Sequence, residues 1–412
     1  ISCFLNKILP MAHNCESQNK TRDNVLKAII FNLMENGPMM IADLATAAGY
    51  SVPTISKYTN HLISEDLVTM PGKINQARGK HPCIYALNGS SKFFIGVDIK
   101  RDSLSMAAMD LAGNIISLEK ENDLLFSNSA PYFEKMTGRV SDFIDSTGTN
   151  RTKIAYICFN IPGRVDSISG RSYSMFTFEG DDTPLAELLT DRMGIPSIIE
   201  NDSRAMTFGW HKLYNRHGYK NYLFVNISYG LGLGIVIDGN IYRGENGYAG
   251  EFGHINTFNN QIICHCGKKG CLETEISGSA ANRIARERIR NGETSILQHI
   301  VSKGEEISPK NLIDALSKED PLCIDILEKM GMELGRHLAN LINIFNPEAV
   351  IISGSLSEDN IFFIESIKHG IRKNSLKLMY KNVNILKDEN AGDIGVIGAC
   401  MIGRWHFAVR GL

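Results

Sequence analysis

The stretch GHINTFNNQIICHCGKKGCLE, residues 253–273, places one histidine and three of the nine cysteines close together. His254 is followed by Cys264, Cys266 and Cys271, and Gly-Lys-Lys-Gly at 267–270 allows a tight turn before the last cysteine. Thiolates and imidazole are ligands that Zn²⁺ prefers, in tetrahedral geometry. Four protein ligands leave no open coordination position, so the set predicts a structural zinc. A chance cluster or a redox pair of cysteines is the alternative.

Two carboxylates flank this cluster. Glu251 lies three residues before His254, and Glu273 follows Cys271 by two. If one ring nitrogen of His254 binds zinc, the other can donate to a ligand hydroxyl. Two carboxylates and an imidazole held rigidly suit a polyol, so we expect zinc to shape a sugar pocket. His265, between two ligands, is expected to point away from the metal.

Length and composition limit the number of domains and the class of protein. The 412 residues allow two or three domains, and 43% hydrophobic and 21% charged content is ordinary for a soluble globular protein. No apolar run is long enough for a membrane span, and the broken apolar start does not predict a signal peptide. The scattered remaining cysteines and their odd total predict a reduced, cytoplasmic protein rather than a disulfide scaffold.

The N-terminal region predicts a DNA-binding module over residues 19–88. Residues 1–90 carry eight Lys or Arg and six Asp or Glu, although the whole chain has a net charge of −2. A helical pattern over 21–36 precedes a short helix, a turn at Gly49 and a second helix from Val52, with Ser51 as its cap. Residues 69–87 then predict a two-stranded ribbon with a basic tip. This order is typical of a winged helix-turn-helix.

Two sets of side chains in this module are expected to meet DNA phosphates and base edges. The exposed face of the third helix is expected to present Thr54, Ser56, Lys57, Thr59 and Asn60, and the basic ribbon Lys73, Arg78 and Lys80. The small core is expected to hold Leu44, Ala45, Ala48, Val52, Ile55, Leu62 and Ile63. A small helical domain with a solvated charged loop is the alternative.

From residue 93 onward, short β-rich runs alternate with helical stretches, which indicates an α/β protein. The first strands form a meander before any long helix, so a mixed sheet fits better than a doubly wound parallel one. GLGLG at 230–234 leads into a strand instead of a helix. It therefore predicts a strand-turn-strand hairpin rather than a dinucleotide-binding turn.

Residues 247–281, GYAGEFGHINTFNNQIICHCGKKGCLETEISGSAA, resemble the signature of the ROK family of sugar kinases and sugar-responsive repressors. Both its Gly-Glu-x-Gly-His and Cys-x-Cys-Gly-x-x-Gly-Cys-Leu-Glu elements are present. NIPGRVD at 160–166, IIENDSRAMTFG at 198–209 and INIFNPEAVIISGS at 342–355 extend the resemblance over about residues 93–405.

The resemblance implies an actin/hexokinase-like (ribonuclease H-like) fold of two α/β lobes with a sugar cleft between them. We expect the first lobe over 92–200, completed by a C-terminal helix at 393–408, and the second, with the zinc site, over 201–392. The implied sugar-binding residues are Gly163, Arg164, Asn201, Asp202, Glu251, His254 and Glu273.

The resemblance also allows the chain to be compared with the family's kinases and with its repressors. In the family's kinases, an Asp at the position of Asp202 takes the proton of the sugar hydroxyl, and two glycine-rich turns hold the ATP phosphates. Here Ile99, Lys100, Arg101 and Asp102 stand in the first turn, and Gly230-Leu231-Gly232 replaces Gly-Thr-Gly. We therefore expect that the chain is not an enzyme and that Asp202 is a vestigial base. The alternatives are that Asp202 simply caps a helix and that Arg164 pairs with an acidic residue of a loop.

These expectations combine into a sugar-responsive DNA-binding regulator, in the first place a repressor. Its expected partners are operator DNA and a sugar or sugar phosphate effector, with no membrane. A homodimer or dimer of dimers would place recognition helices in successive major grooves. An ATP-dependent sugar kinase with an accessory DNA-binding domain, and a regulator whose winged domain docks on a protein, are the alternatives.

Overall fold

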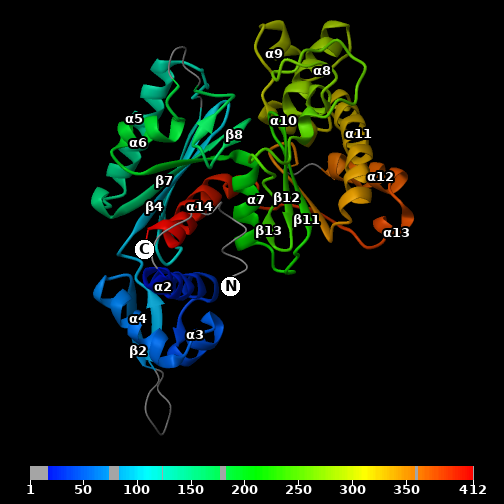
Figure 1. The fold of residues 1–412 in the computed structure, drawn as a ribbon. Coiled ribbons are helices and arrows are strands. Elements are labelled where there is room, and N and C mark those ends of the chain that lie inside the picture. The colour runs from blue at the N-terminus through cyan, green and yellow to red at the C-terminus, as the bar shows by residue number, and fades with distance from the viewer. Residues whose placement is uncertain (1–16, 74–82, 123, 177–181, 358–360, 412) are drawn as a thin grey trace. The chain divides into compact units, whose positions relative to one another are not determined.

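The computed structural model describes residues 17–73, 83–122, 124–176, 182–357 and 361–411. The chain forms two compact units (Figure 1). Unit 1 comprises residues 1–159, 178–198 and 399–412, and unit 2 comprises 160–177 and 199–398. Within the described ranges, we find no helix with the length and apolarity needed to cross a bilayer.

Unit 1 begins with a module of helices and short strands. Its elements follow the order α2 (Ser17–Asn36), β1 (Met39–Met40), α3 (Ile41–Ala48), α4 (Val52–Ser64), β2 (Val68–Lys73) and β3 (Cys83–Leu87). Helix α3 ends because Gly49 adopts a φ of 73°, a left-handed conformation that suits glycine. The Ser51 hydroxyl caps α4 by accepting a bond from the Thr54 amide at 3.4 Å.

The core of this module follows the predicted pattern with one exception. Leu44, Ile55 and Leu62 are buried, and the three strands form a small sheet in the order β1-β3-β2. Val52, predicted for the core, is instead 45% exposed. It is the first residue of α4 and directly follows the Ser51 cap.

The first large sheet lies mainly in unit 1 and has the order β10-β7-β4-β5-β6. Its meander is the antiparallel run β4 (Phe93–Ile99), β5 (Ser103–Asp110) and β6 (Ile115–Asn122). The other elements are α5 (Ala130–Ser146), η1 (Arg151–Lys153), β7 (Ile154–Ile161), α6 (Leu185–Met193) and β10 (Ser197–Asn201). Strand β4 is almost entirely buried, as expected for the central strand of a covered sheet.

The C-terminal helix α14 (Ile394–Arg410) joins the N-terminal module to this sheet within unit 1. Trp405 packs on Phe31 of α2, with ring centroids 4.4 Å apart, and Phe407 lies 5.8 Å from Phe94 of β4. The buried Arg404 guanidinium donates through Nε to the Leu111 carbonyl at 2.8 Å. One apolar cluster therefore runs from the helix-turn-helix into the first sheet.

Unit 2 contains the second large sheet, ordered β13-β12-β11-β14-β15. Its strands are β11 (Tyr222–Ile227), β12 (Leu231–Ile237), β13 (Asn240–Ile241), β14 (Ala349–Ser353) and β15 (Asn384–Lys387). The first three are antiparallel, and β14 and β15 are added in parallel. In chain order both large sheets therefore read third, second, first, fourth, fifth strand. This repeated mixed sheet confirms the predicted α/β class.

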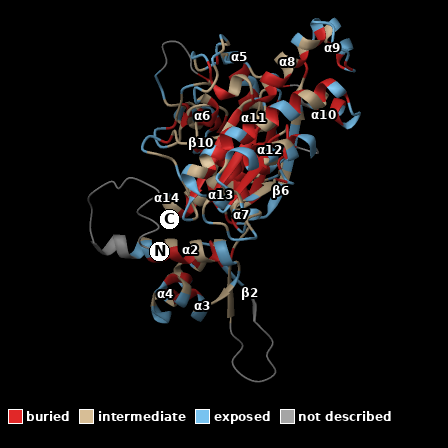
Figure 2. Cartoon of the chain, turned by 90° about the vertical axis from the view of Figure 1, so that its right-hand side faces the viewer, coloured by how far each residue is buried: buried red, intermediate tan, exposed pale blue. Residues whose placement is uncertain are grey.

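The helices and short segments of unit 2 complete its layers. They are β8 (Val165–Asp166), β9 (Arg171–Ser172), α7 (Asp202–Leu213), η2 (Phe252–His254), η3 (Leu272–Thr274), α8 (Gly278–Arg290), α9 (Gln298–Ser302), α10 (Pro309–Ser317), α11 (Pro321–Phe345), α12 (Ile361–Asn374) and α13 (Lys377–Tyr380). Buried residues, red in Figure 2, run along α11 and α12. A Cβ on Gly335 would lie 2.3 Å from the Ile367 carbonyl oxygen, so glycine allows these two helices to touch.

Candidate metal centre and effector site

The cysteine loop of unit 2 folds into the tight turn that its glycines predict. The Gly267 amide donates to the Cys264 carbonyl at 2.8 Å, and the Cys264 amide donates to the Lys268 carbonyl at 2.8 Å. Gly267 and Gly270 have φ values of 84° and 77°, in the left-handed region. A Cβ on Gly270 would stand 2.2 Å from the Phe258 carbonyl oxygen, so only glycine fits there. The turn returns Cys271 to the other thiols.

One ligand atom from each of His254, Cys264, Cys266 and Cys271 lies within 4.8 Å of all the others. The Cys266 and Cys271 sulfurs are 3.6 Å apart, and the Cys264 sulfur lies 3.5 Å from Nδ1 of His254. A tetrahedral zinc with Zn–S bonds of about 2.3 Å would separate its sulfur ligands by roughly 3.8 Å. The spacing and the soft donor set therefore fit zinc.

The thiols and the imidazole also have shifted pKa values in the absence of metal. Burial raises the pKa of the Cys264 thiol to about 12, so a nearby cation is needed to hold it as a thiolate at neutral pH. Burial also lowers the pKa of His254 and keeps its imidazole neutral, the form that binds metals. With Nδ1 facing the sulfurs, Nε2 of His254 lies 3.7 Å from Oε2 of Glu251.

The prediction that His265 points away from the cluster is wrong. Its Nδ1 lies 3.9 Å from the Cys264 sulfur and 3.0 Å from Oε1 of Glu273. The Glu273 carboxylate attracts the imidazole, and this hydrogen bond raises the pKa of His265. His254, Cys264, His265 and Glu273 thus form a second set with metal-ligand spacing. We favour the three-cysteine set because Glu273 already accepts a bond from the Leu231 amide at 3.0 Å.

Asn201 and Asp202 lie at the start of α7, and the two residues have different roles. Asn201 caps the helix, because its Oδ1 accepts from the Arg204 amide at 3.0 Å, while its Nδ2 donates to the Gly163 carbonyl at 2.9 Å. The capping role weighed for Asp202 therefore belongs to Asn201. Asp202 lies in the first turn, and its Oδ1 accepts from the Ser203 amide at 2.7 Å. A helix N-terminus stabilises its negative charge.

Arg164 lies on the β8–β9 hairpin. Its Nε lies 3.3 Å from the Ser174 hydroxyl, and its NH2 group donates to the Tyr173 carbonyl at 3.2 Å. Among the described residues, these are the contacts of its side chain that the structure shows. Its positive charge also opposes protonation of His254 and His265. Unit 2 therefore brings the Gly-Arg element to the metal loop.

Glu200, Arg204 and Arg243 form a buried network of ion pairs that the sequence did not predict. Glu200 accepts from Nε of Arg204 at 2.8 Å and from NH1 of Arg243 at 2.5 Å. Arg204 also donates to the Val165 and Gly247 carbonyls at 2.8 and 2.6 Å. Burial would raise the pKa of Glu200, but the two guanidinium groups outweigh it and lower that pKa to about 2. The Glu-x-x-x-Arg spacing at 200–204 was the available signal, but it spans a strand-helix junction.

The turns at 99–102 and 230–232, which were compared with the kinase phosphate elements, have different surroundings. In unit 1, Asp98 is buried, its Oδ2 lies 3.6 Å from Nζ of Lys100, and the Lys100 amide closes the next turn by bonding to the Ser103 carbonyl. In unit 2, β11 and β12 form the predicted hairpin, with Leu231 buried. A Cβ on Gly230 would stand 2.8 Å from Oε2 of Glu273, so the carboxylate covers this turn.

The expected DNA-contacting face of α4 needs one correction. Lys57 and Asn60 are exposed, and Thr54 and Ser56 are half-buried. Thr59, expected on this face, is 0% exposed, because it lies one helical turn from both Ile55 and Leu62 and shares their core-facing stripe. The backbone of Lys73 ends β2, whereas Arg78 and Lys80 fall outside the described residues.

Comparison with known proteins agrees with the fold. The chain is 26% identical to the xylose repressor of Bacillus spizizenii over 385 residues, covering 92% of this chain and 95% of the repressor. It is 26% identical to the DNA-binding transcriptional dual regulator NagC of Escherichia coli, covering 88% of each chain.

Solved structures extend the comparison. A ROK family transcriptional regulator, a homolog of the E. coli MLC protein, superposes with a TM-score of 0.77 at 25% identity, covering 94% of this chain and 98% of that one. A ROK family glucokinase from Streptomyces griseus, in complex with glucose and AMPPNP, superposes with a TM-score of 0.66 at 25% identity, covering 76% and 99%. The ROK family model matches residues 94–404, and the chain therefore belongs to the ROK family.

Proposed function

We propose that this protein is a sugar-responsive DNA-binding repressor without kinase activity. The observation that carries the proposal is the combination, in one chain, of a winged helix-turn-helix with the Glu251, His254 and Glu273 set. The similarity to the xylose repressor and NagC covers both parts of the chain and supports a repressor role. A DNA-binding role would place the protein in the cytoplasm.

The proposed sugar site is built from polar groups of unit 2. Glu251 and Nε2 of His254 offer an acceptor and a donor side by side, and Asp202 offers a second carboxylate. A polyol needs several oriented acceptors, and an imidazole fixed by zinc through Nδ1 keeps its other nitrogen oriented toward the ligand. Gly163 and Arg164 would complete the site, with Asn201 holding the Gly163 carbonyl.

The proposed zinc is structural. His254, Cys264, Cys266 and Cys271 would hold it, and its chemistry would be to neutralise the thiolates and fix the loop. The residue between Cys264 and Cys266, His265, would support Glu273 through their 3.0 Å contact. The metal thus acts on the effector through the orientation of His254.

Loss of kinase activity is proposed from the two turns. The Leu231 amide is already bonded to Glu273, and its side chain has no hydroxyl for a phosphate. In the other turn Asp102 would repel phosphate oxygens, and Lys100, Arg101 and Asp102 lack the backbone freedom of glycine. Asp202 stands at the position of the kinase base, but without bound ATP it would have no phosphoryl transfer to assist.

DNA binding is proposed to use α4 and the wing. Lys57 and Asn60, with the half-buried Thr54 and Ser56, would enter the major groove, while Lys73, Arg78 and Lys80 would contact phosphates. A dimer would present two such helices to an operator with two half-sites. Sugar binding would change operator affinity only by its differential affinity for the two states.

The test is a thermal-shift panel of free and phosphorylated sugars, each with and without Mg-ATP. A ligand at one hundred times its Kd stabilises the fold by about 2.7 kcal/mol. A sugar that shifts the melting temperature independently of ATP, and that weakens binding to operator DNA by fluorescence anisotropy, is the expected result. Sugar-dependent ATP hydrolysis would instead establish the kinase.

A further inference from the structure

Tyr173 and Tyr248 of unit 2 form an aromatic pair. Their ring centroids lie 6.0 Å apart, and the ring planes meet at 75°. This edge-to-face geometry is one of the arrangements that aromatic rings prefer. Tyr173 is 49% exposed and Tyr248 is half-buried, so the contact leaves ring surface open. Neither residue is a proposed metal ligand or a member of the polar set proposed to bind the sugar.

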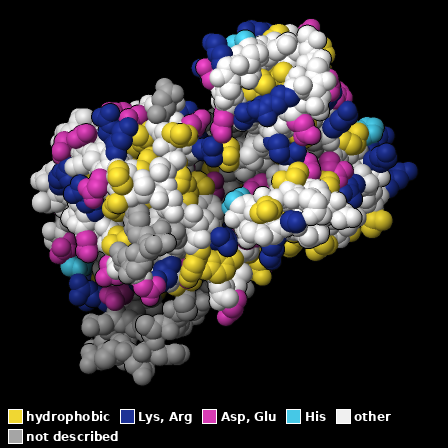
Figure 3. All heavy atoms as spheres, turned by 90° about the horizontal axis from the view of Figure 1, so that it is seen from above, with side chains coloured by type: hydrophobic (Ala, Val, Ile, Leu, Met, Phe, Trp, Pro, Cys, Tyr) yellow, Lys and Arg dark blue, Asp and Glu magenta, His cyan; other side chains and the backbone are white. Residues whose placement is uncertain are grey.

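An exposed tyrosine alone indicates no site. Figure 3 shows hydrophobic side chains, tyrosines included, in separate groups among polar and charged side chains on the face that it draws. Single exposed apolar side chains are normal on protein surfaces. Two features distinguish Tyr173 and Tyr248. Their rings are fixed against each other, and the backbone around each is joined to residues of the proposed sugar site or its support.

The backbone of Tyr173 is bonded to Arg164, which belongs to the proposed sugar site. The Tyr173 amide donates to the Arg164 carbonyl at 2.9 Å, and the Tyr173 carbonyl accepts from the NH2 group of Arg164 at 3.2 Å. The hydroxyl of the next residue, Ser174, accepts from the Arg164 amide at 3.0 Å. The charge of Arg164 in turn acts on His254. Tyr173 is therefore tied to the Gly-Arg part of the proposed site.

Tyr248 lies in the segment that leads to Glu251, three residues later. The carbonyl of the preceding residue, Gly247, accepts from NH1 of the buried Arg204 at 2.6 Å. Burial and a hydrogen bond to the Tyr173 side chain raise the pKa of Tyr248 to about 12, so its phenol stays neutral. The ring is thus fixed by its own backbone and by its partner, next to the carboxylate proposed to accept from the sugar.

The pair offers the surface that a pyranose ring needs from a protein. A pyranose has hydroxyls around its edge, and the C–H bonds of its faces form an apolar surface that packs on an aromatic ring. Tyrosine combines a flat apolar ring with a phenol that can hydrogen-bond, and only two side-chain torsions must be fixed. Glu251, His254 and Asp202 supply carboxylates and an imidazole for one ring. The tyrosines therefore fit a second ring joined to the first.

We propose that the effector is a disaccharide whose second ring packs on Tyr173 and Tyr248. This proposal rests on the proposed sugar-responsive function and names the class of sugar. The first ring would lie against Glu251 and His254, and the second would lie at the β8–β9 hairpin. The tyrosine pair would then make the protein prefer the disaccharide to the monosaccharide that it contains.

The test is isothermal titration of the full chain with matched sugars: glucose with cellobiose, xylose with xylobiose, and N-acetylglucosamine with N,N′-diacetylchitobiose. In the pair that binds, the disaccharide should bind about tenfold more tightly than the monosaccharide, the scale of one packed ring. Tyr173→Ala should remove this preference and leave the monosaccharide affinity unchanged. Tyr173→Phe keeps the ring and should retain the preference.

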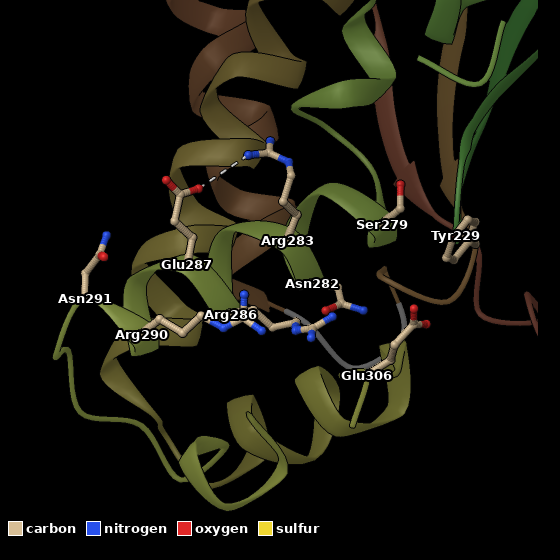
Figure 4. A pocket seen from close by; sticks show the side chains of 9 residues that line it. All are labelled: Tyr229, Ser279, Asn282, Arg283, Arg286, Glu287, Arg290, Asn291 and Glu306. Carbon is tan, nitrogen blue, oxygen red and sulfur yellow. Dashed lines mark ion pairs between the residues drawn. The ribbon is translucent and has the colours of Figure 1, made fainter. Parts of the chain in front are cut away.

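Three further variants locate the binding. Tyr242→Ala removes a tyrosine of the same unit that is also 49% exposed, and it should not change disaccharide binding. Arg290→Gln alters a separate pocket along α8 (Figure 4), whose lining includes neither tyrosine of the pair, and it should also have no effect. Glu251→Gln should abolish binding of both sugars, because both would place their first ring there.

The proposal is overturned if the monosaccharide binds as tightly as its disaccharide, or if Tyr173→Ala and Tyr248→Ala both leave the preference intact. Phenyl β-glucoside binding as tight as that of cellobiose would also overturn it, because an apolar group would then replace the second sugar ring. In each case, sugar binding that Glu251→Gln removes still supports the proposed function. Absence of binding by all the sugars overturns the disaccharide proposal, whereas the proposed function fails only if phosphorylated sugars also do not bind.

Discussion

Gly209 of α7 and Gly398 of α14 let their two helices touch backbone to backbone. A Cβ on Gly398 would lie 2.1 Å from the Ala205 carbonyl oxygen, and one on Gly209 would lie 2.9 Å from the Ile394 carbonyl oxygen. Helix α7 begins at Asp202, in the proposed sugar site, and α14 continues to Trp405, which packs on Phe31 of the proposed DNA-binding module. If the proposed sugar binding displaces α7, we expect this contact to pass the displacement to α14.

Gly398→Val tests that coupling. The added side chain must displace backbone, which should destabilise the fold by about 1–3 kcal/mol and reduce the effect of sugar on operator affinity. Denaturant unfolding measures the first effect and fluorescence anisotropy with operator DNA the second. Gly392→Ala, where a Cβ meets nothing within 4 Å, is the matched control. A normal sugar response in Gly398→Val would show that the helix contact carries no signal.

Removal of a metal ligand should abolish zinc and sugar response together. Cys266→Ser or Cys271→Ser breaks the set that orients His254, while operator binding should survive because α4 lies in unit 1. Metal content by mass spectrometry and sugar-dependent thermal shift are the measurements. Cys323→Ser, a buried cysteine on α11, controls for the loss of a thiol. Zinc retained at full stoichiometry in Cys271→Ser would contradict the assigned ligands.

Glu251→Gln should remove the sugar response and leave operator binding intact. The amide keeps the size of the side chain but loses the charged acceptor beside Nε2 of His254. We expect sugar affinity to fall roughly tenfold or more, the cost of losing a charge-assisted hydrogen bond, as read by titration calorimetry. Loss of operator binding in the same variant would mean that the two functions are not separable.

Glu200 should contribute to acid stability. Its folded pKa of about 2 lies below the ordinary 4.5, so its stabilising contribution is present above pH 4.5 and is lost as the pH falls toward 2. Glu200→Gln leaves two arginines uncompensated and should cost about 3–5 kcal/mol at neutral pH. Unfolding followed by circular dichroism from pH 5 to pH 2 should show a weaker pH dependence in the variant. An unchanged pH dependence would contradict the depressed pKa.

The recognition helix can be tested with a pair of neighbouring residues. Asn60→Ala should weaken operator binding because its side chain is exposed on α4. Thr59→Val should leave binding unchanged and cost little stability, since the buried Thr59 hydroxyl has no hydrogen-bond partner among the described residues. Anisotropy at several salt concentrations gives both answers, since phosphate contacts steepen the salt dependence. Weaker binding in Thr59→Val alone would reverse the orientation assigned to α4.

Local sequence patterns predicted local structure well here. The Ser51 cap, the Gly49 stop and the cysteine turn follow from short-range chemistry, and the structure shows each of them. The orientation of individual polar side chains was predicted less well. Thr59 looked polar and exposed, but its position in the apolar stripe of α4 places it in the core. His265 was misplaced because the carboxylate that attracts it comes from the end of the same loop.

The sequence could not predict ion pairs between residues far apart in the chain. Glu200 and Arg243 are 43 residues apart, and nothing in either segment indicates the other. The common strand order of the two large sheets was also hidden, because it is a repeat of topology and not of residues.

Two sheets of one topology in one chain are what the duplication and fusion of a half-length ancestor would leave. In the first copy, only the short segment between Asn122 and Ala130 separates the third strand from the next helix. In the second, the chain from Ile241 to Gly278 fills the same interval and contains all three clustered cysteines. The interval between the third strand and the next helix is therefore much longer in the second sheet, and it carries Glu251 and the four residues proposed to hold zinc.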